Sequence, residues 1–387
     1  MTAAPTAPAH PSPPAPGQHR LARWGLFPDL PQLRQIVGCL GPNWYASIMG
    51  TGIVANAAAT LPLQFPGLRL VATAVWALAA ALLVALTAAW GAHWVRHREA
   101  ARGHLADPVM AQFYGAPPMA LLTVGAGTLL LGQDVLGTEL AVAVDWVLWS
   151  LGTAASLASA VTVPYLMFTR YQLSAEAAFP GWLMPVVPPM VAAATGALLV
   201  PHTPPGQGQL TLLLGCYAMF GLSLVASLVV ITLVWWRLVQ HKVGPARLVP
   251  TLWIVLGPLG QSITAANLLG GVAHLALPAP YATGFEVFGL VYGVPVWGFA
   301  LLWAALAGLV TLRTVRQGLP FSLTWWSFTF PVGTVVTGTS ALAARAHADF
   351  LAWAAVLFYL GLLAAWSTVA TRTARGSLRG TLFLPVR

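Results

Sequence analysis

Five apolar segments of this chain are interrupted by glycine and proline, and they recur about every 70 residues. They begin near Asn43, Ala111, Pro180, Leu252 and Trp325, and a smoother apolar segment follows each of them. A helix that is interrupted inside a bilayer leaves backbone polar groups without partners, so it is tolerated only where protein or a water-filled cavity covers it. The alternation therefore predicts five interrupted helices that line a pore and five ordinary helices around them.

The composition places these segments in a membrane. Only 7% of the 387 residues are charged and 58% are hydrophobic, whereas about a quarter of the residues of a soluble domain are charged. A spanning helix needs roughly 20 mostly apolar residues, and ten segments meet this requirement. They cover residues 43–61, 69–92, 109–131, 140–168, 181–200, 210–236, 249–270, 282–312, 320–343 and 350–371. We expect an all-α membrane protein whose ten transmembrane helices form five helical hairpins around a central pore.

Little of the chain lies outside these segments. Residues 1–30 are rich in Pro and Ala and lack the apolar stretch of a signal peptide, so we predict a disordered cytoplasmic tail. Residues 31–372 are predicted to form the transmembrane domain and residues 373–387 a second cytoplasmic tail.

The positions of the basic residues predict the orientation. With both termini in the cytoplasm, sixteen of the eighteen Lys and Arg residues lie on the cytoplasmic side, and only Arg69 and Arg345 lie on the other side. This distribution follows the positive-inside rule and predicts a multi-pass protein of the inner or plasma membrane. The basic rim either anchors the helices or raises the anion concentration at a pore mouth.

Helical spacing selects the residues that would line the pore. Residues at i, i+3, i+4 and i+7 share one face of a helix, and each interrupted segment has such a face that is small or weakly polar and uncharged. The predicted pore-lining residues are Ser47, Gly50, Thr51, Ala120, Thr123, Gly127, Pro185, Pro188, Thr195, Gly257, Gly260, Thr264, Asn267, Gly333, Thr334 and Thr337. Small faces also let membrane helices pack closely, but their fivefold recurrence favours a channel.

Phe330 is the bulky exception on the predicted pore face of the ninth span. It lies near mid-membrane among small neighbours. An apolar ring in a narrow, neutral tube blocks ions by closing and dewetting it. The alternative interpretation is an ordinary packed aromatic residue.

Two segments resemble a known family. PNWYASIMGTGIVANAAATLP at residues 42–62 and WWSFTFPVGT at 325–334 resemble the tellurite-resistance/dicarboxylate transporter (TDT) family, which includes TehA, slow-type anion channels, malate permease and sulfite efflux pumps. The resemblance covers about residues 40–372. It implies transport of small anions, such as C4-dicarboxylates, sulfite or inorganic anions, through a pore that is usually part of a homotrimer. It also implies a phenylalanine gate on the ninth helix, which Phe330 matches best, with Phe328 as the runner-up.

Two acidic residues lie within the predicted spans. A charge at the bilayer centre costs roughly 2.5–3.5 kcal/mol, so such residues are functional candidates. Glu286 is a candidate proton site for coupled transport, whereas Asp145 is predicted to be an interfacial residue beside Trp146.

Metal binding is the other chemistry that the titratable residues suggest. His93 and His97 have a spacing that can bind a metal. Nothing in their arginine-rich loop completes a site, so we predict solvated interface histidines and no metal.

Three functions remain open from these residues. The first is an anion channel or facilitator. The second is a proton-coupled carrier for dicarboxylate uptake or sulfite efflux that uses Glu286. A remote third is a membrane-embedded transferase, but the spans lack the paired carboxylates or His–Asp base that such chemistry requires. We therefore predict no enzymatic activity, no cofactor and no nucleic-acid partner, only a small anionic substrate and the lipid bilayer.

Overall fold

The structure is a computed structural model that describes residues 37–174 and 176–383. The predicted tail at residues 1–30 and the last four residues lie outside the described residues. Within the described part of the chain, the secondary structure consists of helices and turns, with no strand. The all-α prediction is therefore confirmed for these residues.

Buried and exposed helices alternate along the chain. The buried helices are α3 (Tyr45–Thr60), α6 (Ala116–Gly127), α9 (Pro188–Leu199), α11 (Leu256–Val272) and α13 (Phe330–Ala346). The exposed ones are longer: α4 (Leu68–Arg96), α8 (Thr138–Thr169), α10 (Gln207–His241), α12 (Tyr281–Gln317) and α14 (Asp349–Arg379). Two short helices, α5 (Arg98–Ala106) and α7 (Gln133–Leu136), also occur in the described residues.

Seven helical segments in the described residues are long and apolar enough to cross a membrane. Two of them, Met110–Leu136 and Ala246–Leu275, consist of α6 or α11 joined to flanking helical turns. Helices α3, α9 and α13 have 16, 12 and 17 residues, so by themselves they are shorter than the predicted spans.

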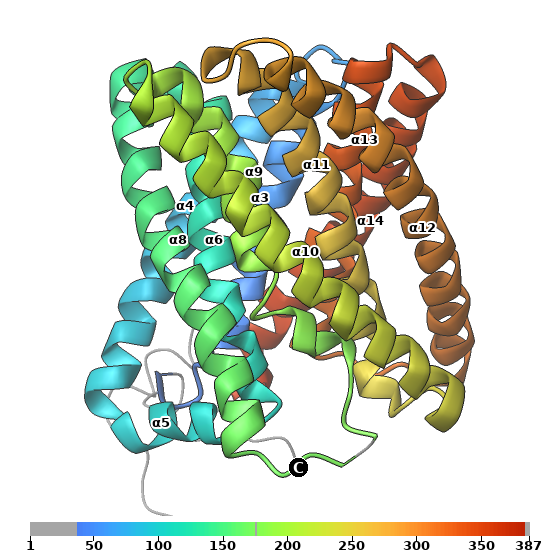
Figure 1. Cartoon of the computed structure of the whole chain (residues 1–387). Helices are drawn as coiled ribbons and strands as arrows, with labels where there is room; N and C mark the ends of the chain where they lie inside the picture. The colour runs from blue at the N-terminus through green and yellow to red at the C-terminus, as the bar shows by residue number, and fades with distance from the viewer. Residues whose placement is uncertain (1–36, 175, 384–387) are drawn as a thin grey trace, which may run out of the picture.

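The buried helices form a closed ring. Helix α3 contacts α6, which contacts α9, then α11, then α13, and α13 contacts α3 again. Each long helix packs outside the ring against the buried helix that precedes it in the chain (Figure 1). In the most apolar part of the Ala246–Leu275 span 89% of the residues are buried, compared with 22% for α4, α8 and α12. The interrupted segments are therefore the protein-covered ones, as backbone satisfaction requires.

A 3₁₀ segment precedes each buried helix. These segments are η1 (Pro42–Trp44), η2 (Met110–Gly115), η4 (Pro180–Leu183), η6 (Ala246–Val255) and η8 (Leu323–Phe328). Each contacts the next in this order, so they gather at one end of the ring, here called the collar end; the opposite end is the far end.

Proline explains why three of the five buried α-helices start beyond the collar. Pro117, Pro188 and Pro331 occupy the first or second positions of α6, α9 and α13. A proline at that position has no N–H to leave unsatisfied, and its fixed φ suits a helix start.

Indole groups of the long helices bind the backbone of the ring. Trp149 Nε1 donates to the Ala192 carbonyl at 2.9 Å, and Trp303 Nε1 donates to the Leu252 carbonyl at 2.8 Å. Trp76 Nε1 approaches the Val124 carbonyl at 3.3 Å, next to the π-helical turn η3 (Thr128–Gly132). The indole N–H of a tryptophan can donate a hydrogen bond to a backbone carbonyl that an irregular helix leaves unpaired inside a bilayer.

The last described residues of the chain pack on the collar. The predicted boundary at residue 372 falls within α14, which ends before Gly380, where φ is 88°. That left-handed conformation favours glycine and terminates the helix. After this turn, the Phe383 ring stacks on Trp44 of η1, with 5.1 Å between ring centroids.

The histidine segment after α4 is a docked helix, α5, and not the exposed loop that the sequence predicted. The His93 side chain is fully buried, and its Nδ1 lies 2.7 Å from the Val37 carbonyl oxygen. Its ring stacks with His97 and His104 at centroid distances of 5.9 and 5.3 Å. The prediction of solvated histidines is therefore wrong for His93. No metal-compatible cluster of three or more His, Cys, Asp or Glu side chains occurs in the described residues.

This packing predicts that α5 loosens in acid. Burial, and then the neighbouring His93, lower the pKa of His104, whereas Asp107 opposes the shift. Because the packed state favours the neutral imidazole, it loses stability as the pH falls below about 6.5, the ordinary histidine value. Hydrogen exchange of residues 98–106 should be several-fold faster at pH 5.5 than at pH 7.5, after correction for intrinsic exchange. His104→Gln should reduce this difference; an unchanged difference would contradict the assignment.

Candidate functional site

A cavity of about 170 Å³ lies inside the ring and is lined by residues of all five buried helices and of η3. The lining residues are Ile53, Asn56, Thr60, Thr123, Ala126, Leu130, Val191, Ala194, Thr195, Leu198, Gln261, Thr264, Leu268, Phe330 and Thr337. None of these fifteen side chains is charged. The cavity is therefore a neutral chamber that contains hydroxyl and amide groups.

The hydroxyl groups are anchored to their own helices. Thr123, Thr195 and Thr264 donate to carbonyls four residues earlier, at 2.6, 3.0 and 3.0 Å. Thr337 donates to the Thr334 carbonyl, and its oxygen lies 2.9 Å from Thr264 Oγ1. These bonds hold the threonines in place on α6, α9, α11 and α13.

Two amides in the cavity are only partly satisfied. Asn56 Nδ2 donates to the Thr123 carbonyl at 3.0 Å, but Asn56 Oδ1 has no partner among the described residues. Gln261 Oε1 also lacks a partner there, and the Gln261 amide donates no hydrogen bond to a described group. Because buried polar groups are normally paired, Gln261 is the cavity group best placed to bind a polar ligand.

Five predicted site residues line this cavity together: Thr123, Thr195, Thr264, Thr337 and Phe330. Phe330 is the first residue of α13, so it lies toward the collar end. Its side chain is buried, with 3% of its surface exposed. The runner-up, Phe328, lies in η8 and packs against Trp253 and Trp325 at centroid distances of 5.8 and 5.6 Å. Phe328 is not among the lining residues.

The other predicted pore residues do not line the cavity. On α3, Ser47 Oγ donates to the Trp44 carbonyl, and Thr51 Oγ1 accepts from Trp366 of α14. Gly50 abuts Thr329 and Trp326. The predicted face of α3 is therefore turned toward α14 and the collar, while Ile53, Asn56 and Thr60 face the cavity.

Several predicted small residues serve close helix contacts instead. Gly260 packs on the Thr334 backbone, Gly333 on Ile53, and Gly127 on Trp76 and Asn56. Thr334 Oγ1 donates to the Leu256 carbonyl, and Asn267 Nδ2 donates to the Ile263 and Gly289 carbonyls. The Pro185 carbonyl accepts from Ser159 of α8. The remaining three are buried: Ala120, Pro188 and Gly257. A small face suits a neighbouring helix as well as a cavity.

Glu286, the predicted proton site, lies outside the central cavity. Its carboxylate forms an ion pair with Arg345 at the far end, and its side chain is 52% exposed. Asp145, predicted to be interfacial, is fully buried instead, against Gly125 of α6. Both Asp145 oxygens lack hydrogen-bond partners among the described residues. The prediction failed because distance along the helix does not reveal which face of α8 meets the ring.

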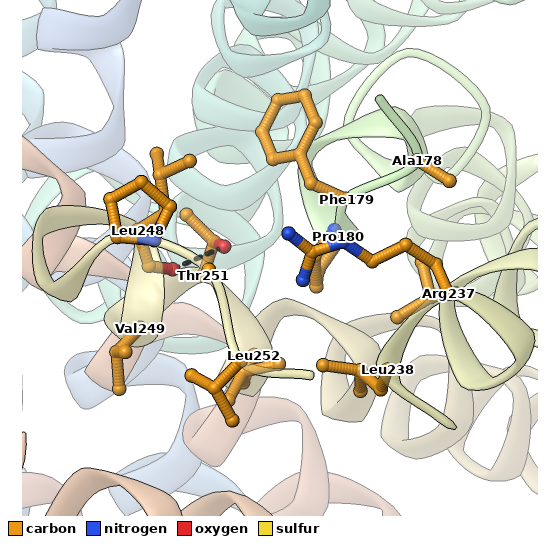
Figure 2. Close-up of a pocket in the computed structure, with 13 residues that line it drawn as sticks. Ala178, Phe179, Pro180, Arg237, Leu238, Leu248, Val249, Thr251 and Leu252 are labelled. Carbon is orange, nitrogen blue, oxygen red and sulfur yellow. Dashed lines mark hydrogen bonds between the residues drawn. The ribbon is translucent and has the colours of Figure 1, made fainter. Parts of the chain in front are cut away.

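A separate recess at the collar end has a structural role (Figure 2). Figure 2 shows the Arg237 side chain reaching across it from α10 toward Pro180. Arg237 Nη1 donates to the Lys242 carbonyl at 3.0 Å, and Nε donates to the Glu176 carbonyl at 3.4 Å. The recess holds about 20 Å³, which is room for a single water molecule. Arg237 therefore links the segments around Glu176 and Lys242 through hydrogen bonds.

Asn56 and Gln261 are the two amides among the ten cavity residues that the sequence analysis missed. Both are amides inside apolar segments, and this polarity was the available signal, because polar residues in spans usually face the bundle interior. Gln261 lies four residues after Gly257, on the same helix face as Thr264. The sequence analysis placed Gly260, and not Gln261, on the pore-lining face of this helix.

Comparison with known proteins reveals one family. The model of the SLAC1 family, described as voltage-dependent anion channel, matches residues 39–374. A sulfite efflux pump of Trichophyton rubrum is 30% identical over 350 residues, covering 88% of this chain and 92% of that protein. An uncharacterized transporter of Methanocaldococcus jannaschii is 27% identical over 346 residues, covering 88% and 94%. The sulfite efflux pump of Saccharomyces cerevisiae is 21% identical over 364 residues, covering 78% of each chain.

Proposed function

The chain belongs to the SLAC1 family of voltage-dependent anion channels, and from this premise we propose that it carries small anions through the cavity inside the helix ring. The supporting observation is that all five buried helices contribute to one uncharged chamber that contains Phe330. A neutral lining permits passage without tight capture, and an apolar ring can close such a tube by dewetting it. In this proposal Phe330 is the gate, and Gln261 and the threonines contact the anion.

The proposed membrane arrangement has ten spans in five hairpins. Helices α3, α9 and α13 reach the membrane surface through η1, η4 and η8 at their collar ends. The collar end faces the cytoplasm, because the positive-inside rule places the basic residues of the chain there. The resemblance to TDT transporters adds a homotrimer in the inner or plasma membrane.

Sulfite is the first substrate to test, because relatives with 30% identity are named sulfite efflux pumps. Purified protein in liposomes should carry sulfite down its gradient, and malate, chloride and nitrate should be compared in the same preparation. Protein-free liposomes provide the control for leakage. Absence of flux for all four anions would refute the proposed function.

The second candidate function is proton-coupled transport, and Asp145 is the observation that favours it. Burial of an ionised carboxylate without partners costs several kcal/mol, and intramembrane acids of this kind often take part in proton relays. Glu286 fits this role less well, because its carboxylate is half exposed and already paired with Arg345.

Asp145→Asn should abolish accumulation of anion driven by a pH gradient and preserve downhill flux. The amide has nearly the same shape but cannot exchange a proton. The measurement is uptake into liposomes with and without a pH gradient, and Glu286→Gln, which removes the other acidic residue of the predicted spans, is compared in the same assay. Loss of accumulation in Glu286→Gln, but not in Asp145→Asn, would assign the proton site to Glu286 instead.

A further inference from the structure

We propose that Arg345 is the recognition residue of a second anion site, at the far end of the conduit, and that it selects small oxyanions over halides. The inference rests on the proposed function and extends it, because the central cavity contains no charged side chain. Arg345 is one of two basic residues that the charge pattern placed on the external side.

The far end contains a cavity of about 420 Å³ between α11, α12 and α13. Its lining includes Arg345, Glu286 and His347. Leu268 lines both this cavity and the central one. On α11, the face that carries Gln261 and Thr264 continues through Leu268 to Val272. The two cavities therefore follow one another along the same helix, and an anion that leaves the central chamber past Leu268 meets Arg345.

Two adjacent glycines at the end of α11 shape this site. A Cβ atom at Gly271 would lie 3.0 Å from Nη2 of Arg345, so glycine leaves room for the guanidinium. A Cβ atom at Gly270 would lie 2.6 Å from the Phe285 carbonyl oxygen. Glycine there permits the close approach of α12 that brings Glu286 to Arg345.

The guanidinium is held in a way that allows its partner to be exchanged. Arg345 Nη2 donates to the Asn267 carbonyl at 3.1 Å, which fixes the group to α11, and Nη1 donates to the Glu286 carboxylate. The Arg345 side chain is 21% exposed, whereas that of Glu286 is 52% exposed. An incoming anion can thus displace the more exposed carboxylate, and the partly buried positive charge keeps a negative partner throughout. Glu286 is in this view an internal competitor for the anion.

Arginine chemistry defines the class of anion. The planar guanidinium offers parallel N–H donors that match two oxygens of one anion, as in carboxylate recognition. A halide presents a single centre and cannot use this geometry. The site therefore favours sulfite-like or carboxylate anions over chloride.

The test is equilibrium binding of sulfite and of chloride to detergent-purified protein, measured by thermal stabilisation at constant ionic strength. Arg345→Lys keeps the charge and loses the fork, so the dissociation constant for sulfite should rise about tenfold, the effect of one lost charge-assisted hydrogen bond. Its chloride affinity should stay unchanged. Arg345→Gln should weaken both anions, and Glu286→Gln should tighten both several-fold.

Arg69→Gln is the matched control. Arg69 also pairs with a carboxylate, Asp134, at 2.6 Å, but lines neither cavity. It should leave both affinities unchanged. If Arg345→Gln alone fails to fold, the double variant Arg345→Gln/Glu286→Gln, which removes both charges, provides the same comparison.

Sulfite binding to either Arg345 variant at wild-type affinity would overturn the proposed site. Equal loss of sulfite and chloride affinity in Arg345→Lys would overturn the selectivity. Arg345-dependent binding without flux in liposomes would refute the proposed transport function and leave this site intact. Flux with binding that is independent of Arg345 would refute only the site.

Discussion

Replacement of Phe330 by alanine should increase sulfite flux through the purified protein by about tenfold or more, which corresponds to a barrier lower by about 1.4 kcal/mol or more. Phe330 is the one aromatic side chain among the residues that line the central cavity. An apolar ring in a narrow neutral passage keeps water and ions out, and alanine removes that obstruction. The measurement is the initial rate of downhill flux in liposomes at equal protein density.

Two variants make this test specific. Phe330→Leu retains apolar bulk and should keep the flux close to that of the wild type. Phe328→Ala removes a ring two residues earlier, which packs against Trp253 and Trp325 outside the cavity, so it should not open the passage. An unchanged rate in Phe330→Ala, or an equal increase in Phe328→Ala, would exclude Phe330 as the gate.

Gly260→Ala should destabilise the folded protein by about 3 kcal/mol, at the upper end of the usual cost of overpacking. A Cβ atom at Gly260 would lie 2.4 Å from the Thr334 carbonyl carbon and 2.5 Å from the Val335 nitrogen. These are backbone atoms of α13, so no side chain can rotate to relieve the clash. The two helices would have to separate along the contact that joins α11 to α13.

The control lies one helical turn away. Gly257 is also buried, yet nothing lies within 4 Å of a Cβ atom placed there. Gly257→Ala should therefore keep the stability or raise it by up to about 1 kcal/mol through helix propensity. The measurement is the apparent melting temperature in detergent. Equal melting temperatures for the two variants would contradict the assigned contact between α11 and α13.

Local signals predicted the helices well. The predicted span 210–236 lies inside α10, and 282–312 lies inside α12, because each long outer helix is a continuous apolar segment. The interrupted segments coincide with the buried helices and their 3₁₀ segments, and in α6, α9 and α13 a proline stands at the helix start, which its own chemistry favours. Apolar length and the position of proline are properties of residues adjacent in the sequence, so neither requires knowledge of how the helices pack.

Side-chain placement was much harder to predict. On α11, Gly257 and Gly260 look alike in sequence, yet one faces open space and the other touches α13. On α3, Ser47 and Thr51 were predicted to face the pore, but their side chains form hydrogen bonds with the collar and with α14. Asn56 faces the cavity instead. Asp145 and His93 lie near the ends of their helices. Both are nevertheless buried, because each lies on a packed face of its helix.

The sequence by itself determined the helical class, the alternation of interrupted and smooth helices, and the family. Hydrophobic length, proline and charge act within one segment, and this makes them readable without coordinates. Only the tertiary structure decided how far each helix is rotated about its axis, and hence that Gln261 faces the cavity and that Arg345 meets Glu286. The physical reason is that small and weakly polar faces pack against a helix as readily as they border a cavity, so the contacts of all the helices together select the rotation.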